Sequence, residues 1–192
     1  EIRNDELAAE TIRALPADVR DTMGAGDAFI GGYLAATLQG APPEAALQHG
    51  AATAARFLKD GACVVLADRD AAVVEDVRAG FAKQFGQDVV RAVTCDVTDE
   101  ASVAALFAAS GPLDIVIANA GAADSAPLHR TTLAQWNAML AVNLTGTFLC
   151  TQEAIKIMKA QKPMGGRIIN NGSISAYAPR PGSAPYTISK HA

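Results

Sequence analysis

Short apolar runs alternate with helix-like segments from residue 62 onward, and this alternation constrains the fold more than any other feature of the chain. The runs are apolar almost throughout, whereas a strand with one face in water would carry a polar residue at every second position. Strands of this kind occur in parallel sheets that helices cover on both faces. The sequence therefore predicts an α/β fold in three layers, with strands at 62–68, 88–96, 113–121 and 166–173.

Helices are predicted between these strands and also before them. Ahead of residue 50 the chain shows no such strands, and its apolar stretch at 28–38 ends at Gly40 and a proline pair, which is typical of a helix. We therefore expect a mostly helical segment at 1–50 and an α/β domain at 51–192. The predicted helices cover 5–15, 28–38, 43–59, 70–85, 99–109, 132–161 and 183–192.

Composition and charge exclude several classes of protein. Half of the 192 residues are hydrophobic and the net charge is −4, so we expect neither a disordered chain nor a surface that binds nucleic acid. No stretch is long and apolar enough for a membrane span. The three cysteines form no C-x-x-C pair and the three histidines show no ligand spacing, so we expect reduced thiols, no metal and a cytoplasmic location.

Small or polar residues follow the end of every predicted strand. Ligands of an open parallel sheet bind beyond the carboxyl ends of its strands, so these residues are candidates for binding. Asp68 lies 18 residues after Gly50, close to the spacing of about 20 at which a dinucleotide-binding fold places an acid on the adenosine ribose. A single aspartate in this position is more often a turn former or a helix cap. The whole set comprises Asp68, Asp96, Asn119, Ala120, Gly121, Gly172 and Ser173.

Tyr186 and Lys190 lie four residues apart in the last predicted helix, so their side chains project from one face. A free tyrosine has a pKa of about 10, and an adjacent ammonium lowers this pKa by stabilising the phenolate. Such a tyrosine could exchange a proton near neutral pH. Ser173, thirteen residues earlier, could donate a hydrogen bond to a substrate oxygen. A tyrosine and a lysine at this spacing are by themselves common, and they usually form a solvated pair.

Asn143 falls within the apolar stripe of the long helix at 132–161. Burial of an amide in such a stripe costs free energy unless its polar atoms find hydrogen-bond partners. Two interpretations are open. Asn143 bonds to a neighbouring backbone segment, or it holds a water molecule that relays protons to Lys190.

Residues 50–192 resemble the classical short-chain dehydrogenase/reductase family. The pieces that carry the resemblance follow the family's order: GAATAARF, VVLAD, CDVTD, IANAG, VNLTGTF, INNGSIS and YTISK. The resemblance implies a Rossmann-like sheet and hydride transfer between a nicotinamide dinucleotide and a small-molecule alcohol or ketone. It also implies a catalytic set with Tyr186 as the acid and base. That set comprises Asn143, Ser173, Tyr186 and Lys190.

The same resemblance implies the residues that bind the cofactor. Asp68 matches a position that favours NAD over NADP, although Arg69 beside it could accommodate a 2′-phosphate. Members of the family associate as dimers or tetramers through such long helices, which makes a homo-oligomer an open expectation. The implied cofactor-binding residues are Gly50, Asp68, Arg69, Asp96, Val97, Asn119, Ala120, Gly121, Tyr186 and Lys190.

Two parts of the family's pattern do not match this sequence. The first strand and most of its glycine-rich loop should precede Gly50, where the sequence reads EAALQH, and the sequence stops soon after Lys190. The resemblance places the missing strand between the first and third predicted strands, at the centre of the sheet. We therefore expect an incomplete sheet, with the first 50 residues packed outside it, and weak or absent binding of NAD.

Residues 17–50 resemble instead the C-terminal signature of the ribokinase family of sugar kinases. The motif DTMGAGDAF carries this resemblance. It implies that Asp27 opens a helix and deprotonates a sugar hydroxyl, while backbone amides of Gly24, Ala25 and Gly26 hold an anion. Three functions stay open: an NAD-dependent oxidoreductase, which we favour, a sugar kinase, and an inactive chimera of the two families.

Overall fold

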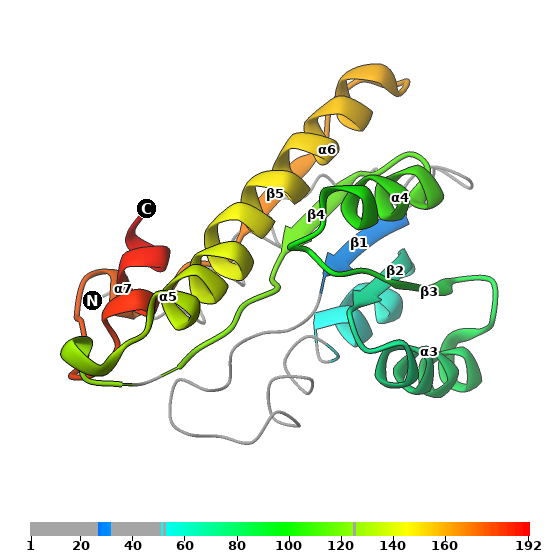
Figure 1. Cartoon of the computed structure of the whole chain (residues 1–192). Coiled ribbons are helices and arrows are strands. Elements are labelled where there is room, and N and C mark those ends of the chain that lie inside the picture. The colour runs from blue at the N-terminus through cyan, green and yellow to red at the C-terminus, as the bar shows by residue number, and fades with distance from the viewer. Residues whose placement is uncertain (1–26, 32–50, 52, 125) are drawn as a thin grey trace.

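The computed structural model describes residues 27–31, 51, 53–124 and 126–192, and these form a sheet of five parallel strands flanked by helices (Figure 1). The strands lie in the order β3-β2-β1-β4-β5. The predicted parallel α/β fold is confirmed. The strands are β1 (Asp27–Gly31), β2 (Cys63–Asp68), β3 (Val90–Thr94), β4 (Ile115–Ala118) and β5 (Arg167–Asn170).

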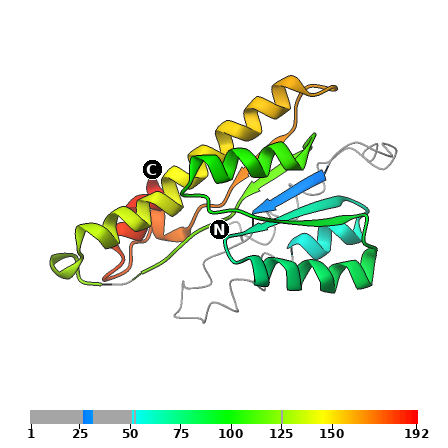
Figure 2. The same ribbon diagram turned by 45° about the vertical axis from the view of Figure 1, so that its right-hand side comes forward.

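Helices cover both faces of the sheet and make it the middle of three layers (Figure 2). Successive side chains of β2 point to opposite faces. Val65 packs in one apolar cluster with α4 and α6, whereas Val64 packs in another with α3 and the helical residues 53–59. The helices are α3 (Ala71–Phe85), α4 (Glu100–Ser110), α5 (Leu133–Leu140), α6 (Thr147–Ala160) and α7 (Ala184–His191), with short 3₁₀ turns at Leu128–Arg130 and Ile174–Ala176.

Aspartates at the strand ends start two of these helices. The side chain of Asp70 accepts hydrogen bonds from the N–H groups of Ala72 and Val73, and that of Asp99 accepts one from Ala101. An N-cap of this kind satisfies backbone donors that the first turn leaves without partners. The turn after each strand is thus fixed locally, and it directs the next helix back across the sheet.

The central strand is the main difference from the sequence prediction. The sequence predicts a helix at 28–38, but residues 27–31 form β1 between β2 and β4. The expectation that the first 50 residues pack outside the sheet is therefore wrong for residues 27–31, and residues 32–50 lie outside the described residues. Without a strand in this position, the facing N–H and C=O groups of β2 and β4 would lack partners, and this requirement outweighs the weak helical pattern of a short apolar run. Residues 5–15 lie outside the described residues.

The long helical stretch predicted at 132–161 is present, but it is not a uniform α-helix. The helices α5 and α6 are joined by a π-helical turn at Ala141–Gly146. Thr132 starts the stretch with a capping box to Gln135. Leu144, Phe148 and Ile155 are exposed along it. No helix in the described part of the chain has the length and hydropathy that a membrane crossing requires.

Candidate functional site

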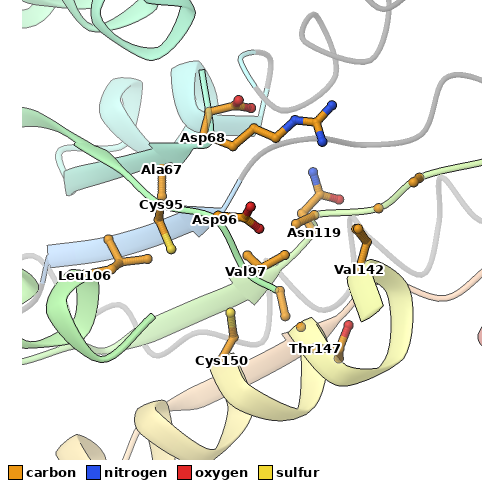
Figure 3. Close-up of a pocket in the computed structure, with 16 residues that line it drawn as sticks. Ala67, Asp68, Cys95, Asp96, Val97, Leu106, Asn119, Val142, Thr147 and Cys150 are labelled. Carbon is orange, nitrogen blue, oxygen red and sulfur yellow. The ribbon is translucent and has the colours of Figure 1, made fainter. Parts of the chain in front are cut away.

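A pocket opens at the carboxyl ends of β2, β3 and β4 and holds about 780 Å³, including the solvent at its mouth (Figure 3). Parallel sheets bind ligands at this edge. The residues at the strand ends, the turns after them and the start of α6 form its walls. They are Ala67, Asp68, Arg69, Cys95, Asp96, Val97, Leu106, Ala118, Asn119, Ala120, Gly121, Ala122, Val142, Gly146, Thr147 and Cys150.

Two carboxylates, those of Asp68 and Asp96, lie in the lining of the pocket. Burial raises the pKa of the Asp68 carboxyl, although the N–H of Asp70 and the charge of Arg69 act in the opposite direction. Hydrogen bonds from the backbone and the hydroxyl of Thr98 lower the pKa of the exposed Asp96. Both groups can accept hydrogen bonds from a bound hydroxyl or amine.

The floor of the pocket is apolar and close-packed. Burial raises the pKa of the Cys95 thiol, and it raises the pKa of the Cys150 thiol to about 12. Both thiols therefore stay neutral and behave as small apolar groups. A Cβ at Gly146 would come within 2.8 Å of Cγ2 of Val97. Only glycine at this position allows the π-helical turn to pack this closely against Val97.

Asn143 lies in the π-helical turn and is buried, with all of its polar atoms paired. Its Oδ1 accepts a hydrogen bond of 2.7 Å from the N–H of Ala122, and its Nδ2 donates to the carbonyl of Ala122 at 2.9 Å. The Nδ2 also lies 2.9 Å from Oγ of Ser189. The first interpretation of Asn143, a bond to a neighbouring backbone segment, is confirmed. It ties the segment after β4 to α7.

The ammonium of Lys190 is held close to Asn143. Its Nζ donates to the carbonyl of Asn171 at 2.9 Å, and burial lowers its pKa. The side chain of Asn171 in turn donates to Oδ1 of Asn119 at 2.8 Å. A Cβ added to Gly121 would lie 3.4 Å from Oδ1 of Asn143 and 3.7 Å from Nζ of Lys190, so these two polar groups flank Gly121.

Tyr186 lies one turn before Lys190 in α7 and is 4% exposed. Oγ of Ser189 donates to the carbonyl of Tyr186 at 2.7 Å, which links the backbone of Tyr186 to Asn143. Ser173 caps the turn Ile174–Ala176, and its Oγ accepts from the N–H of Ser175. This turn packs against α7. The helix therefore carries Tyr186 and Lys190 between the turn of Ser173 and the π-helical turn of Asn143.

We predict that Asn143→Ala lowers the free energy of unfolding by about 1–3 kcal/mol, the range for a buried backbone group that loses its partner. The substitution leaves both the N–H and the carbonyl of Ala122 without the amide. Urea unfolding followed by circular dichroism measures the change. Asn137→Ala, an exposed change in the same helical stretch, is the matched control. Equal loss in the two variants would mean that the contacts of Asn143 contribute nothing.

The structure brings together most of the predicted site residues. It does not describe some of the others. Asn143 and Lys190 flank Gly121. Gly121 is one of the predicted residues that line the pocket, together with Asp68, Arg69, Asp96, Val97, Asn119 and Ala120. The positions Gly24, Ala25, Gly26 and Gly50 lie outside the described residues. Asp27 starts β1 instead of a helix and pairs with Cys63 at the amino edge of the sheet, opposite the pocket. The prediction that Asp27 opens a helix is therefore wrong.

The sequence prediction missed two residues that hold the site together. Asn171 anchors Lys190 and contacts Asn119, and Ser189 bridges Asn143 and Tyr186. Asn171 follows directly after β5, so the rule that directed the search to strand ends could have found it. For Ser189 the only available signal was its position three residues after Tyr186.

Comparison with known proteins gives two family matches. A family model described as short chain dehydrogenase matches residues 49–192, and one described as pfkB family carbohydrate kinase matches residues 6–65. The NADP-dependent (R)-specific alcohol dehydrogenase of Lentilactobacillus kefiri is 40% identical over 148 residues, which are 74% of this chain and 57% of that protein. The chain spans about half the length of the curated relatives it matches.

Solved structures match most of the chain. A short chain dehydrogenase from Mycobacterium smegmatis superposes with a TM-score of 0.74 at 28% identity, over 87% of this chain and 66% of that one. Sorbitol-6-phosphate 2-dehydrogenase from Erwinia amylovora does so with a TM-score of 0.70 at 30% identity, over 74% of this chain and 57% of that one. The sheet and its covering helices are therefore similar to those of dehydrogenases.

Proposed function

The chain belongs to the short-chain dehydrogenase family, and from this premise we propose that it is an oxidoreductase that interconverts a small-molecule alcohol and its ketone. The observation that carries the proposal is the placement of two groups at one edge of the sheet. The pocket has Asp68 and Gly121 in its wall, and Asn143 and Lys190 flank Gly121. Lys190 lies on α7, the helix that also carries Tyr186. Binding and proton transfer would thus occur side by side.

The residues present fit a nicotinamide dinucleotide. Small and apolar residues line much of the pocket, and the carboxylate of Asp68 suits a ribose hydroxyl. Asp96 and Asn119 offer further polar groups at the same strand ends. When bound, the nicotinamide supplies the acceptor or donor of the hydride.

The roles proposed for the chain's own residues rest on its membership of the family. Tyr186 holds the proton that moves to or from the substrate oxygen, and the ammonium of Lys190 in the same helix stabilises its phenolate. Ser173 donates a hydrogen bond to the same substrate oxygen. Asn143 acts as a positioning residue, because its contacts with Ala122 and Ser189 hold α7 in place.

The proposed cofactor is NAD in preference to NADP. The carboxylate of Asp68 can accept hydrogen bonds from ribose hydroxyls but repels a 2′-phosphate. Two observations act against this preference: Arg69 lines the same pocket, and the Lentilactobacillus kefiri relative is described as NADP-dependent. The affinities of the protein for NAD and NADP decide whether these two observations outweigh the carboxylate of Asp68.

We expect NAD to bind more tightly than NADP, and Asp68→Ala to weaken NAD binding by about tenfold or more, the scale of one lost charge-assisted hydrogen bond. Isothermal titration calorimetry with both dinucleotides measures this. Asp88→Ala is the control, because Asp88 precedes β3 at the other edge of the sheet. Equal affinity of the unaltered protein for the two dinucleotides would show that Arg69 compensates for the carboxylate.

Titrations with ATP and with NADH test the two other functions. The match of residues 6–65 to carbohydrate kinases supports a sugar kinase, but β1 carries Asp27 to the edge of the sheet opposite the pocket. A kinase would bind ATP and not NADH, and an inactive chimera would bind neither. NADH binding is read from the increase in its fluorescence. Binding of ATP alone would overturn the oxidoreductase proposal.

A further inference from the structure

We infer that Asn171 is a positioning residue for the proposed reaction, because its backbone carbonyl holds the ammonium of Lys190 where this charge can stabilise the phenolate of Tyr186. The inference rests on the proposed function and goes beyond it. Asn171 belongs neither to the lining of the pocket nor to the catalytic set that the family resemblance implies. It is identified by the hydrogen bonds that it makes directly after β5.

Hydrogen bonds to the end of β4 fix Asn171 independently of the lysine. Its N–H donates to the carbonyl of Ala118 at 3.3 Å, which continues the pairing of β5 with β4. Its side chain donates to Oδ1 of Asn119 at 2.8 Å, and Asn119 is buried. With the N–H and the side chain anchored in this way, the carbonyl of Asn171 accepts the hydrogen bond of 2.9 Å from Nζ of Lys190.

The ammonium of Lys190 therefore has a neutral partner. Burial lowers the pKa of Lys190 because it disfavours the charged form, and a hydrogen bond to the carbonyl of Asn171 favours that form. A carboxylate in the same place would neutralise the ammonium. A carbonyl leaves the positive charge to act on the phenolate of Tyr186, which lies one turn earlier in α7.

The described elements that pack against α7 offer the lysine no competing charge. They are α5, the π-helical turn and the turn at Ile174–Ala176, and none of them contains a titratable side chain. The segment 119–122 beside the lysine contains none either. Within α7 the other titratable groups are Tyr186 and His191, and Nδ1 of His191 lies 3.0 Å from the carbonyl oxygen of Ala176. The carbonyl of Asn171 is thus the contact that positions the ammonium.

The first test is the pH dependence of turnover with a panel of secondary alcohols. We expect Asn171→Ala to raise the pH of half-maximal alcohol oxidation by about one pH unit, the lower end of the effect of a nearby opposite charge. Without its side-chain anchor the carbonyl holds the ammonium less firmly, so a higher pH is needed to form the phenolate. The plateau at high pH should stay close to that of the unaltered protein, whereas general damage to the fold would lower turnover at every pH.

Asn170→Ala is the matched control. Asn170 is the last residue of β5, and its side chain accepts a hydrogen bond of 3.3 Å from the hydroxyl of Thr151 in α6 instead of bonding to Asn119. Its pH profile should equal that of the unaltered protein. If Asn171→Ala does not fold, Asn119→Ala takes its place, because it removes the same side-chain hydrogen bond from the other partner.

A second measurement uses the protein without dinucleotide or substrate. Acetylation of Lys190 by acetic anhydride at fixed pH is followed by mass spectrometry of the peptide that contains it. We expect acetylation to be several-fold faster in Asn171→Ala, because the amine is held less firmly by the carbonyl, and to be unchanged in Asn170→Ala.

The outcomes separate this inference from the proposed function. Faster acetylation of Lys190 together with the shifted pH profile supports the inference. An unshifted profile, or acetylation at the rate of the unaltered protein, overturns it while the proposed function stands. If the unaltered protein binds no dinucleotide, the proposed function fails, and the inference fails with it. If the protein binds NADH but oxidises no alcohol of the panel, the acetylation rates decide.

Discussion

If the chain has the proposed function, replacing Tyr186 with phenylalanine is expected to lower the turnover of alcohol oxidation by about 100-fold or more, the usual scale of a lost general acid or base. The change removes only the hydroxyl, so the ring keeps its place in the buried face of α7, where Tyr186 is 4% exposed. Asn143 is linked through Ser189 to the backbone carbonyl of Tyr186, so the loss of the Tyr186 hydroxyl leaves these hydrogen bonds intact. The loss should therefore lie in the chemical step and not in folding.

Turnover is measured from the absorbance of reduced nicotinamide with a panel of secondary alcohols. Tyr177→Phe is the control, because it makes the same chemical change at a side chain that is 90% exposed. Its turnover should match that of the unaltered protein. If Tyr186→Phe retains full turnover with an alcohol that the protein oxidises, Tyr186 has no part in proton transfer.

Phe107→Ala lowers the free energy of unfolding by about 3–5 kcal/mol, the range for removal of a buried aromatic ring. Phe107 is 1% exposed, and it lies in the apolar cluster that joins α4 and α6 to one face of the sheet. Its neighbours in this cluster include Val116 of β4 and Met158 of α6. A cavity here weakens the contact of α6 with the sheet, and α6 also forms part of the pocket wall.

Urea unfolding followed by tryptophan fluorescence and circular dichroism measures this loss. Phe148→Ala provides the comparison, because the same atoms are removed from a side chain that is 57% exposed in α6. That variant should lose little stability in the isolated monomer. A small loss for Phe107→Ala, close to that of Phe148→Ala, would contradict the role of Phe107 as a core residue.

The strands after residue 62 were predictable because each of them is a short apolar run, and β2 and β4 are buried over most of their length. Apolar runs such as CVVLAD end at an aspartate or asparagine that starts the next turn. The apolar run and the turn-forming residue therefore predict the same strand end. The four predicted strands enclose β2, β3, β4 and β5, with ends that differ by a few residues. Local sequence determines these elements, and tertiary contacts only trim them.

The strand β1 was not predictable in this way. Its five residues, DAFIG, are too few to distinguish the period of a strand from that of a helix, and the apolar residues after them extend a helical pattern. What decides its conformation is the need of β2 and β4 for a common neighbour, and that need depends on pairs distant in sequence, such as Phe29 with Val116. Single-sequence patterns carry no record of such pairs.

The candidate site was predictable where chemistry and position coincide. Asp68 and Lys190 have common structural explanations when taken singly, and they stand out because several strand ends and the last helix carry polar groups in one order. The π-helical turn around Asn143 leaves no such mark, since its wider hydrogen-bond spacing is a property of the backbone. The role of Ser189 could not be predicted either, because a serine in a helix has no distinctive sequence pattern and its partner Asn143 lies 46 residues away in the chain.

The central place of β1 also imposes an order on folding. A strand with neighbours on both sides cannot be added to a finished sheet, so β2 and β4 must each close onto it. The pairing of Asp27 with Cys63 closes a much shorter loop than that of Phe29 with Val116, and longer loops close at a greater entropic cost. During synthesis, β2 and β3 leave the ribosome before β4 does. Until residues 115–118 emerge, one edge of β1 has unpaired backbone groups, and this nascent edge is where the chain is most exposed to pairing with the wrong partner.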